Sequence, residues 1–264
     1  MWTVAIALAA IVGAGCGRFG FGADDPGRDA PQVGDGGTDV VTMGGDGGVD
    51  APEFFACTGS EVCEGFESGF GVWMADAMVS LDATRAHRGN HSVHVHSPAF
   101  AAGGSSYQAI YQSQTVSANI NPFWVRGWFW LSARPNFDNA MELMTAERPS
   151  TSSGDYVFVH ADSTNVYSQF DAQIMQTSTL VPVGQWFCLI WKVTRNTGTS
   201  GALELSGDVT VSLANTKTDS TTSSLQIVVL GIGYASSNTP VAQPAQDLWI
   251  DDVIVSASAV TCSD

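Results

Sequence analysis

The chain has little positive charge. Its 264 residues include 10 lysines and arginines against 26 aspartates and glutamates, which gives a formal net charge of −16 at pH 7. Proteins that hold nucleic acid neutralise its phosphates with lysine and arginine side chains. The composition therefore argues against nucleic acid as a partner, and against anionic lipids or polyanionic ligands held by charge alone.

The chain also lacks a hydrophobic run long enough to cross a bilayer, which takes about 20 apolar residues. Residues 4–12 form an apolar run of nine, followed by Gly13-Ala14-Gly15-Cys16. This order predicts a signal peptide over residues 1–16 and an exported protein. Because it ends in a cysteine, it resembles the bacterial lipobox, in which the cysteine is acylated after cleavage.

The lipobox resemblance implies a lipid anchor on Cys16, through which the protein contacts a membrane. Gly17 rather than aspartate follows the cysteine, and this favours the outer membrane or cell surface as the location. An ordinary cleaved signal that leaves an unmodified cysteine is the alternative.

Aromatic residues are absent between Phe21 and Phe54. Residues 17–55 consist mainly of Gly, Asp, Pro, Ala and Val, and they carry eight acids against two arginines. Such a segment buries too little apolar surface to offset the entropy that ordering would cost. We expect a disordered Gly/Asp-rich linker over residues 17–55, with a reach of roughly 30–40 Å, and a folded domain over residues 56–264.

Cysteines are few. Besides Cys16 there are four, at Cys57, Cys63, Cys188 and Cys262. An even number in an exported chain predicts two disulfides. Cys57 and Cys63 are close enough in sequence to close a small loop, which leaves Cys188 to pair with Cys262. A pairing that links the N-terminal segment to the C-terminal strand is the alternative.

Long helical periodicity is missing from residues 56–264. Short alternating runs separated by Gly, Asn, Ser and Pro predict strands instead. They cover residues 92–97, 107–114, 123–132, 142–146, 155–160, 168–174, 185–195, 202–205, 209–213, 225–231 and 247–256. This pattern predicts an all-β fold, a two-sheet antiparallel jelly-roll sandwich.

Five short motifs occur in an order that resembles the concanavalin A-like lectin/glucanase superfamily, which includes laminin-G-like domains. They are Phe66-Glu67-Ser68-Gly69 with Trp73, Arg88-Gly89-Asn90-His91-Ser92-Val93, Trp124-Val125-Arg126-Gly127-Trp128, Val183-Gly184-Gln185-Trp186 and Ile250-Asp251-Asp252-Val253. The resemblance covers about residues 57–262 and implies a jelly roll that binds glycans. With the lipobox and the linker, the whole is similar to surface lipoproteins of myxobacteria.

Asp251 and Asp252 stand in a β-branched run near the C-terminus, where consecutive carboxylates are costly unless something compensates them. A hard cation such as Ca²⁺ is the usual compensation. First and last strands often pair in β-sandwiches, so Glu67 could meet the two aspartates. In calcium-bearing relatives the matching positions hold the ion, and the resemblance implies a structural calcium at Glu67, Gly89, Asp251 and Asp252. Acids that merely face solvent or a turn amide are the alternative.

Trp124, Arg126 and Trp128 share one face of the strand predicted over residues 123–132, together with Trp130. Sugar rings stack on aromatic faces, and arginine donates paired hydrogen bonds to hydroxyl or carboxylate groups. Trp124, Arg126 and Trp128 are therefore a candidate glycan-binding platform. The alternative is that Trp128 and Trp130 lie in the sandwich core.

Catalytic patterns are lacking. Glu142 and Glu147 are five residues apart, a spacing that sends them to opposite faces of a regular strand. Retaining glycoside hydrolysis requires two carboxyl groups close together. We therefore expect a non-catalytic, surface-anchored carbohydrate-binding protein. A divergent glycoside hydrolase or polysaccharide lyase, and a structural or adhesive protein that binds other proteins, are the alternatives.

Overall fold

The computed structural model describes residues 60–112, 115–117, 119–148, 151–168, 173–178, 180–193, 202–206, 211–214 and 226–263. The predicted signal peptide with Cys16, the predicted linker and Cys57 lie outside these residues. Within them, no helix is long and apolar enough to cross a bilayer.

Almost all regular secondary structure in the described residues is β-strand. In chain order these are β1 (Ser60–Glu64), β2 (Trp73–Ala75), β3 (Val79–Asp82), β4 (Ser92–Ser97), β5 (Ser106–Gln112), β6 (Phe123–Leu131), β7 (Met141–Arg148), β8 (Thr151–Val159), β9 (Thr164–Ser168), β10 (Gln173–Thr177), β11 (Trp186–Val193), β12 (Ala202–Ser206), β13 (Val211–Ala214), β14 (Ile227–Tyr234) and β15 (Gln246–Ser256). A 3-10 helix, Ser236–Asn238, precedes β15.

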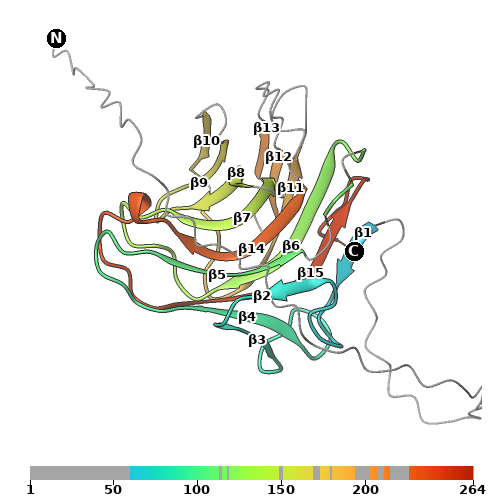
Figure 1. The fold of residues 1–264 in the computed structure, drawn as a ribbon, viewed down its shortest axis with the longest axis horizontal. Coiled ribbons are helices and arrows are strands. Elements are labelled where there is room, and N and C mark those ends of the chain that lie inside the picture. Colours follow the sequence, from blue (N-terminus) through green and yellow to red (C-terminus); the bar gives the residue numbers. More distant parts are fainter. Residues whose placement is uncertain are drawn as a thin grey trace, which may run out of the picture. The chain divides into compact units, whose positions relative to one another are not determined.

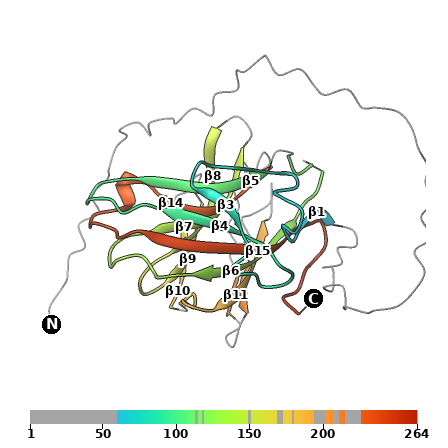
Figure 2. The ribbon, with the colours of Figure 1, turned by 90° about the horizontal axis from the view of Figure 1, so that it is seen from below.

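The strands pair antiparallel in two sheets that pack as a sandwich (Figures 1 and 2). Sheet A has the order β13-β12-β11-β6-β15-β4-β3, with β1 also paired to β15. Sheet B has the order β10-β9-β8-β7-β14-β5-β2. The predicted all-β, two-sheet antiparallel fold is confirmed.

The core lies between the sheets and is built by the period-two alternation of each strand. On β6, Val125 and Phe129 are fully buried and point inward, whereas the alternate tryptophans are only half-buried. Leu230 and Ile232 of β14 meet them from sheet B as part of the same buried cluster. Each sheet therefore has one apolar face, and its second face is left to carry polar and aromatic side chains.

The predicted pairing of the first and last strands is confirmed. Cys63 of β1 stands opposite Ile254 of β15, and β4 pairs with the earlier half of β15. The register between β15 and β6 shifts after Asp251, and Asp252 has a φ of 46°. This bulge turns the chain locally, so that both consecutive aspartates leave the β-branched core side.

Some predicted strand positions are wrong. The strand predicted over residues 168–174 joins the ends of two strands, since β9 ends at Ser168 and β10 begins at Gln173. The strands β2 and β3 were not predicted. Both are short edge strands of three and four residues, too brief for alternation to reveal them.

Candidate functional site

The outer face of sheet B carries a row of side chains that crosses five strands. Successive Cα partners along the row are Tyr107 of β5, Gly233 of β14, Glu142 of β7, Phe158 of β8 and Asn165 of β9. Neighbouring strands lie 4.7–4.9 Å apart, so the row spans roughly 19 Å. Directly paired residues point to the same side of a sheet, and the row is therefore one continuous surface.

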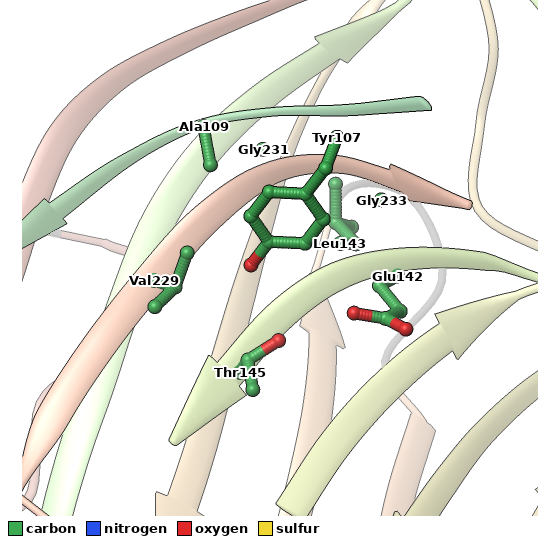
Figure 3. Close-up of a pocket in the computed structure, with 8 residues that line it drawn as sticks. All are labelled: Tyr107, Ala109, Glu142, Leu143, Thr145, Val229, Gly231 and Gly233. Atoms are coloured by element: carbon green, nitrogen blue, oxygen red, sulfur yellow. The ribbon is translucent and has the colours of Figure 1, made fainter. Parts of the chain in front are cut away.

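A small pocket lies in this surface between β5, β14 and β7 (Figure 3). The ring of Tyr107 lies across β14, and Glu142 and Thr145 of β7 lie beyond it. We call this region the Tyr107 pocket; it is lined by Tyr107, Ala109, Glu142, Leu143, Thr145, Val229, Gly231 and Gly233.

Glu142 and Glu147 lie on the same face of β7, which corrects the prediction that they point to opposite faces. The register of β7 shifts beside Leu143 against both β8 and β14. Glu142 therefore pairs with Gly233, whereas Glu147 pairs with Ile227. The shift is a β-bulge, which re-aims the side chains that follow it. Five residues of spacing thus bring two carboxyl groups to one surface.

Two glycines of β14 make room for the Tyr107 ring. A Cβ at Gly233 would lie 2.8 Å from Cε2 of Tyr107 and 3.0 Å from Cβ of Glu142. A Cβ at Gly231 would lie 2.3 Å from the carbonyl oxygen of Gln108. Any side chain at these positions would push the ring or the neighbouring strand away, so the glycines form the floor of the pocket.

The acids of this face are held in an environment that disfavours their charge. Burial, together with the charge of Glu147, raises the pKa of Glu142 to about 7. Burial alone raises the pKa of Glu147 to about 7. Although 38% of Tyr107 is exposed, its hydroxyl is enclosed, and burial with the charges of Glu147 and Glu142 raises its pKa well above the ordinary value. Near neutral pH these groups can both donate and accept hydrogen bonds.

The row ends in a polar group formed by Asn165 of β9 and His160, the residue after β8. Nε2 of His160 lies 2.8 Å from Nδ2 of Asn165, and the ring centroids of His160 and Phe158 are 6.4 Å apart. Burial lowers the pKa of His160 and so favours the neutral imidazole, which can accept the amide proton of Asn165 at Nε2. This end therefore offers a fixed, uncharged hydrogen-bonding surface.

The predicted glycan platform lies on the outer face of sheet A, and the structure brings its members together on β6. Trp124 is half-buried, with Nζ of Lys192 5.5 Å from its ring centroid. Arg126, however, is 0% exposed, and its Nη1 donates to the carbonyl oxygen of Thr261 at 2.7 Å. Arg126 therefore fastens the C-terminal segment instead of facing a ligand.

The segment over residues 83–91, which we call the strap, covers the tryptophans of this face. The ring of His87 stacks on Trp128 with centroids 3.7 Å apart. The guanidinium of Arg85 lies 3.4 Å above the Trp130 ring and 4.3 Å from the Trp249 ring. The alternative that Trp128 and Trp130 lie in the core is wrong, because the opposite face of β6 supplies the core side chains.

The strap is also bound by the predicted calcium ligands. Oδ2 of Asp251 accepts from the amides of His87 and Arg88 at 2.8 and 3.3 Å, and Oδ2 of Asp252 lies 2.7 Å from Nδ1 of His87. Oε1 of Glu67 accepts from the amides of residues 90 and 91. A Cβ at Gly89, where φ is +69°, would lie 2.1 Å from that oxygen. All four predicted residues thus lie along one short segment.

Two properties of these four residues bear on cation binding: their charge and the hydrogen bonds that they already accept. Burial and the neighbouring Asp252 raise the pKa of Asp251 to about 7. The strap amides that donate to Asp251 therefore do not fully compensate its negative charge, and a bound cation would relieve it. Yet Asp251 and Glu67 already accept from amides, and Asp252 lies 2.7 Å from Nδ1 of His87 and 3.8 Å from Nε of Arg88. Among the described residues no group of three or more His, Cys, Asp or Glu side chains is arranged to hold a metal. Calcium here remains a prediction.

The disulfide predicted between Cys188 and Cys262 is confirmed, with Cα atoms 5.9 Å apart. It joins β11 to the segment that follows β15. Cys63 is also disulfide-bonded, whereas its predicted partner Cys57 lies outside the described residues.

Tyr107, Gly231 and Gly233 were not predicted as site residues. The only sequence signal for them is the alternation in Ser106-Tyr107-Gln108-Ala109-Ile110-Tyr111 and in Gly231-Ile232-Gly233. That alternation shows which residues share a face, but not which two strands become neighbours.

No protein-family model matches the sequence, and no curated protein matches it either. Solved structures do share its fold. A cellulose-induced protein, Cip1, is similar over 77% of this chain and 100% of its own, with 19% identity and a TM-score of 0.58. An endo-β-1,4-glucuronan lyase from the fungus Trichoderma reesei is similar over 79% and 96%, with 12% identity and a TM-score of 0.51.

A third structure belongs to botulinum neurotoxin type C, from work on its interaction with two ganglioside molecules. It is similar over 77% of this chain and 49% of its own, with 11% identity and a TM-score of 0.52. At these identities the likeness concerns the fold, a β-sandwich of the jelly-roll type.

Proposed function

We propose that this chain is a carbohydrate-binding protein whose glycan site is the Tyr107 pocket and the row that crosses sheet B. The observation that carries the proposal is the position of Tyr107. A partly exposed aromatic ring lies on a glycine floor, with the hydroxyl of Thr145 and the carboxyl of Glu142 in the same pocket.

Such a surface suits a sugar ring. The apolar CH face of a pyranose stacks on an aromatic ring, while its hydroxyl groups need precisely placed donors and acceptors at the edge. The carboxyl of Glu142, which lines the pocket, supplies such a group. Asn165 and His160 continue them along the row, in the direction that a polysaccharide chain would follow across the strands.

The names of the similar structures agree with this proposal. One acts on glucuronan and another comes from work on gangliosides, both of which are carbohydrate ligands. Fold likeness alone is a weak warrant for function, so the proposal depends on the pocket.

The Tyr107 pocket fits a glycan better than the stripe of Trp124, Arg126 and Trp128. On that stripe Arg126 is buried against the C-terminal segment and Trp128 is covered by His87. Trp124 is partly exposed. Among the described residues, the polar side chain in contact with its ring is that of Lys192.

We further propose that the protein is exported and held at the outer membrane or cell surface by a lipid on Cys16. The residues around Cys16 support this location, and residues 17–55 would hold the sandwich away from the membrane where it can meet extracellular glycans.

Hydrolysis is the second candidate function, and the shared face of Glu142 and Glu147 favours it. Glycoside hydrolysis uses one protonated and one ionised carboxyl group on the two sides of the bond that is cleaved. Two carboxyl groups with pKa values of about 7 exist in both forms near neutral pH, so that one can act as acid and the other as base.

The test uses the full chain with a glycan array, followed by calorimetric titration of each hit. Tyr107→Ala should weaken binding by about 1–3 kcal/mol, by analogy with nucleobases stacked on aromatic side chains, while Trp124→Ala should leave it unchanged. Loss in Trp124→Ala alone would move the site to sheet A, and equal loss in both variants would contradict a site confined to sheet B. Release of reducing ends from a bound glycan without the unsaturated sugar that a lyase leaves, and absent in Glu142→Gln, would identify a hydrolase.

A further inference from the structure

The charge of the Tyr107 pocket is negative. Glu142 lines the pocket, Glu147 follows on the same face of β7, and both act on the Tyr107 hydroxyl. Asp76, whose Oδ2 accepts from the amide of Ala109 at 3.0 Å, adds a third acid at the β5 side. The charges of three carboxyl groups thus act on Tyr107.

No positive charge balances these acids within the part of the chain whose side chains are described. None of the eight residues that line the pocket is lysine or arginine. Arg85, Arg126 and Lys192 lie on the outer face of sheet A, beside Trp130, Thr261 and Trp124. Arg88 lies 3.8 Å from Asp252, and Nε of Arg134 donates to the carbonyl oxygen of Val181 at 3.0 Å.

We propose that the Tyr107 pocket selects neutral glycans and rejects glycans built from uronic acids. The proposal rests on the function proposed above and specifies its ligand class. Like charges in a partly enclosed site repel more strongly than in water. A uronate carboxylate placed over Tyr107 would meet Glu142 and Glu147, and none of the residues that line the pocket is a cation that could pair it.

The same acids can bind a neutral sugar favourably. A carboxylate accepts hydrogen bonds from sugar hydroxyls, and a protonated carboxyl also donates one. Neither bond requires a charge on the ligand. The pocket therefore discriminates at the C6 position of the sugar, where a hydroxymethyl group is exchanged for a carboxylate.

Matched ligand pairs test this selection directly. Oligosaccharides of β-1,4-glucan and β-1,4-glucuronan of equal length differ only at C6, and β-1,4-mannan and β-1,4-mannuronan form a second pair. Titration of the full chain in the presence of a chelator, which removes bridging cations, should show at least about tenfold tighter binding of the neutral member. The double variant Glu142→Gln/Glu147→Gln should reduce this preference, and Asp247→Asn, which removes an acid from sheet A, should leave it intact.

Binding of a uronate equal to or tighter than that of its neutral partner would overturn the selection while leaving the proposed glycan site in place. A preference that survives unchanged in the double glutamine variant would also overturn it, because the acids would then not be its cause. If no member of either pair binds and the glycan array is empty, the proposed function itself fails.

Discussion

Glu142 and Glu147 lie on one face of β7, where the charge of Glu147 adds to burial in raising the pKa of Glu142 to about 7. The relationship depends on the register shift beside Leu143. Two acids that a regular strand would separate are thus held in one partly enclosed surface, next to the ring of Tyr107.

The first prediction concerns pH and stability. A carboxyl group with a raised pKa in the folded state binds its proton more tightly there than in the unfolded chain, so stability falls as pH rises from about 4.5 to about 7. Glu142→Gln should therefore raise the free energy of unfolding above pH 7, by as much as about 3 kcal/mol, and change it little at pH 5. Denaturant titrations at the two pH values measure this.

Asp247→Asn is the matched control. Burial works against its charge, but hydrogen bonds from His96 and His94 prevail and lower the pKa of Asp247. The charged carboxylate of Asp247 stabilises the folded protein at pH values above the pKa it has in the unfolded chain, and this contribution is lost as pH falls. Asp247→Asn removes the contribution and should therefore destabilise the protein above pH 7. A pH-independent effect of Glu142→Gln would contradict the prediction.

The second prediction separates the two glycines of the pocket floor. Gly233→Ala places its Cβ against the Tyr107 ring, which can tilt, so glycan binding should weaken while the protein stays folded. Gly231→Ala meets the backbone of Gln108 and Ala109 and should destabilise the protein by about 1–3 kcal/mol. Thermal melting and glycan titration of both variants check this, and an identical response of the two would contradict it.

The third prediction concerns the C-terminal segment. The Cys188–Cys262 disulfide closes a loop with a sequence separation of 74 residues. Cys262→Ser should lower the free energy of unfolding by about 2–5 kcal/mol. Arg126→Met removes the hydrogen bond to the carbonyl oxygen of Thr261. It should lower the free energy of unfolding less in the Cys262→Ser background than in the wild type, because the hydrogen bond and the disulfide hold the same segment. Additive losses would show that the two contacts act independently.

The fourth prediction concerns the anchor. Cys16→Ala should abolish partitioning of the protein into detergent, since a run of nine apolar residues cannot hold a chain in a bilayer. Phase separation of cell extracts measures this, with Cys63→Ala as the control for cysteine loss alone. An alanine variant that stays in the detergent phase after signal cleavage would contradict the lipid anchor.

The fold could be predicted further than the site. Alternation along residues 123–131 identified which side chains of β6 share a face, because a strand has a fixed period of two. The same rule misplaced Glu142 relative to Glu147, since the bulge beside Leu143 depends on both neighbouring strands and leaves no local signature. Arg126 was expected at a ligand, but its true partner, the carbonyl oxygen of Thr261, lies 135 residues away in sequence. The positions of Glu142 and Arg126 thus depend on contacts with residues far away in the sequence, which local sequence patterns do not reveal.

The last prediction concerns the strap and calcium. Glu67 binds one half of the strap and Asp251 and Asp252 bind the other, so three acids surround a segment of a few residues. The raised pKa of Asp251 indicates that the loop amides and His87 leave negative charge uncompensated. A calcium ion that completes its ligands with carbonyl oxygens of the strap would relieve this charge and stabilise only the folded state.

Calcium should then raise the melting temperature, by an amount that corresponds to about 2.7 kcal/mol at a hundredfold excess over the dissociation constant. Glu67→Gln and Asp252→Asn should each remove the response to calcium and to chelator, whereas Asp247→Asn on the same strand as Asp252 should retain it. Melting curves that are indifferent to calcium and chelator in the wild type would remove the ion. The three acids would then stabilise the strap through their bonds to its amides and to His87 alone.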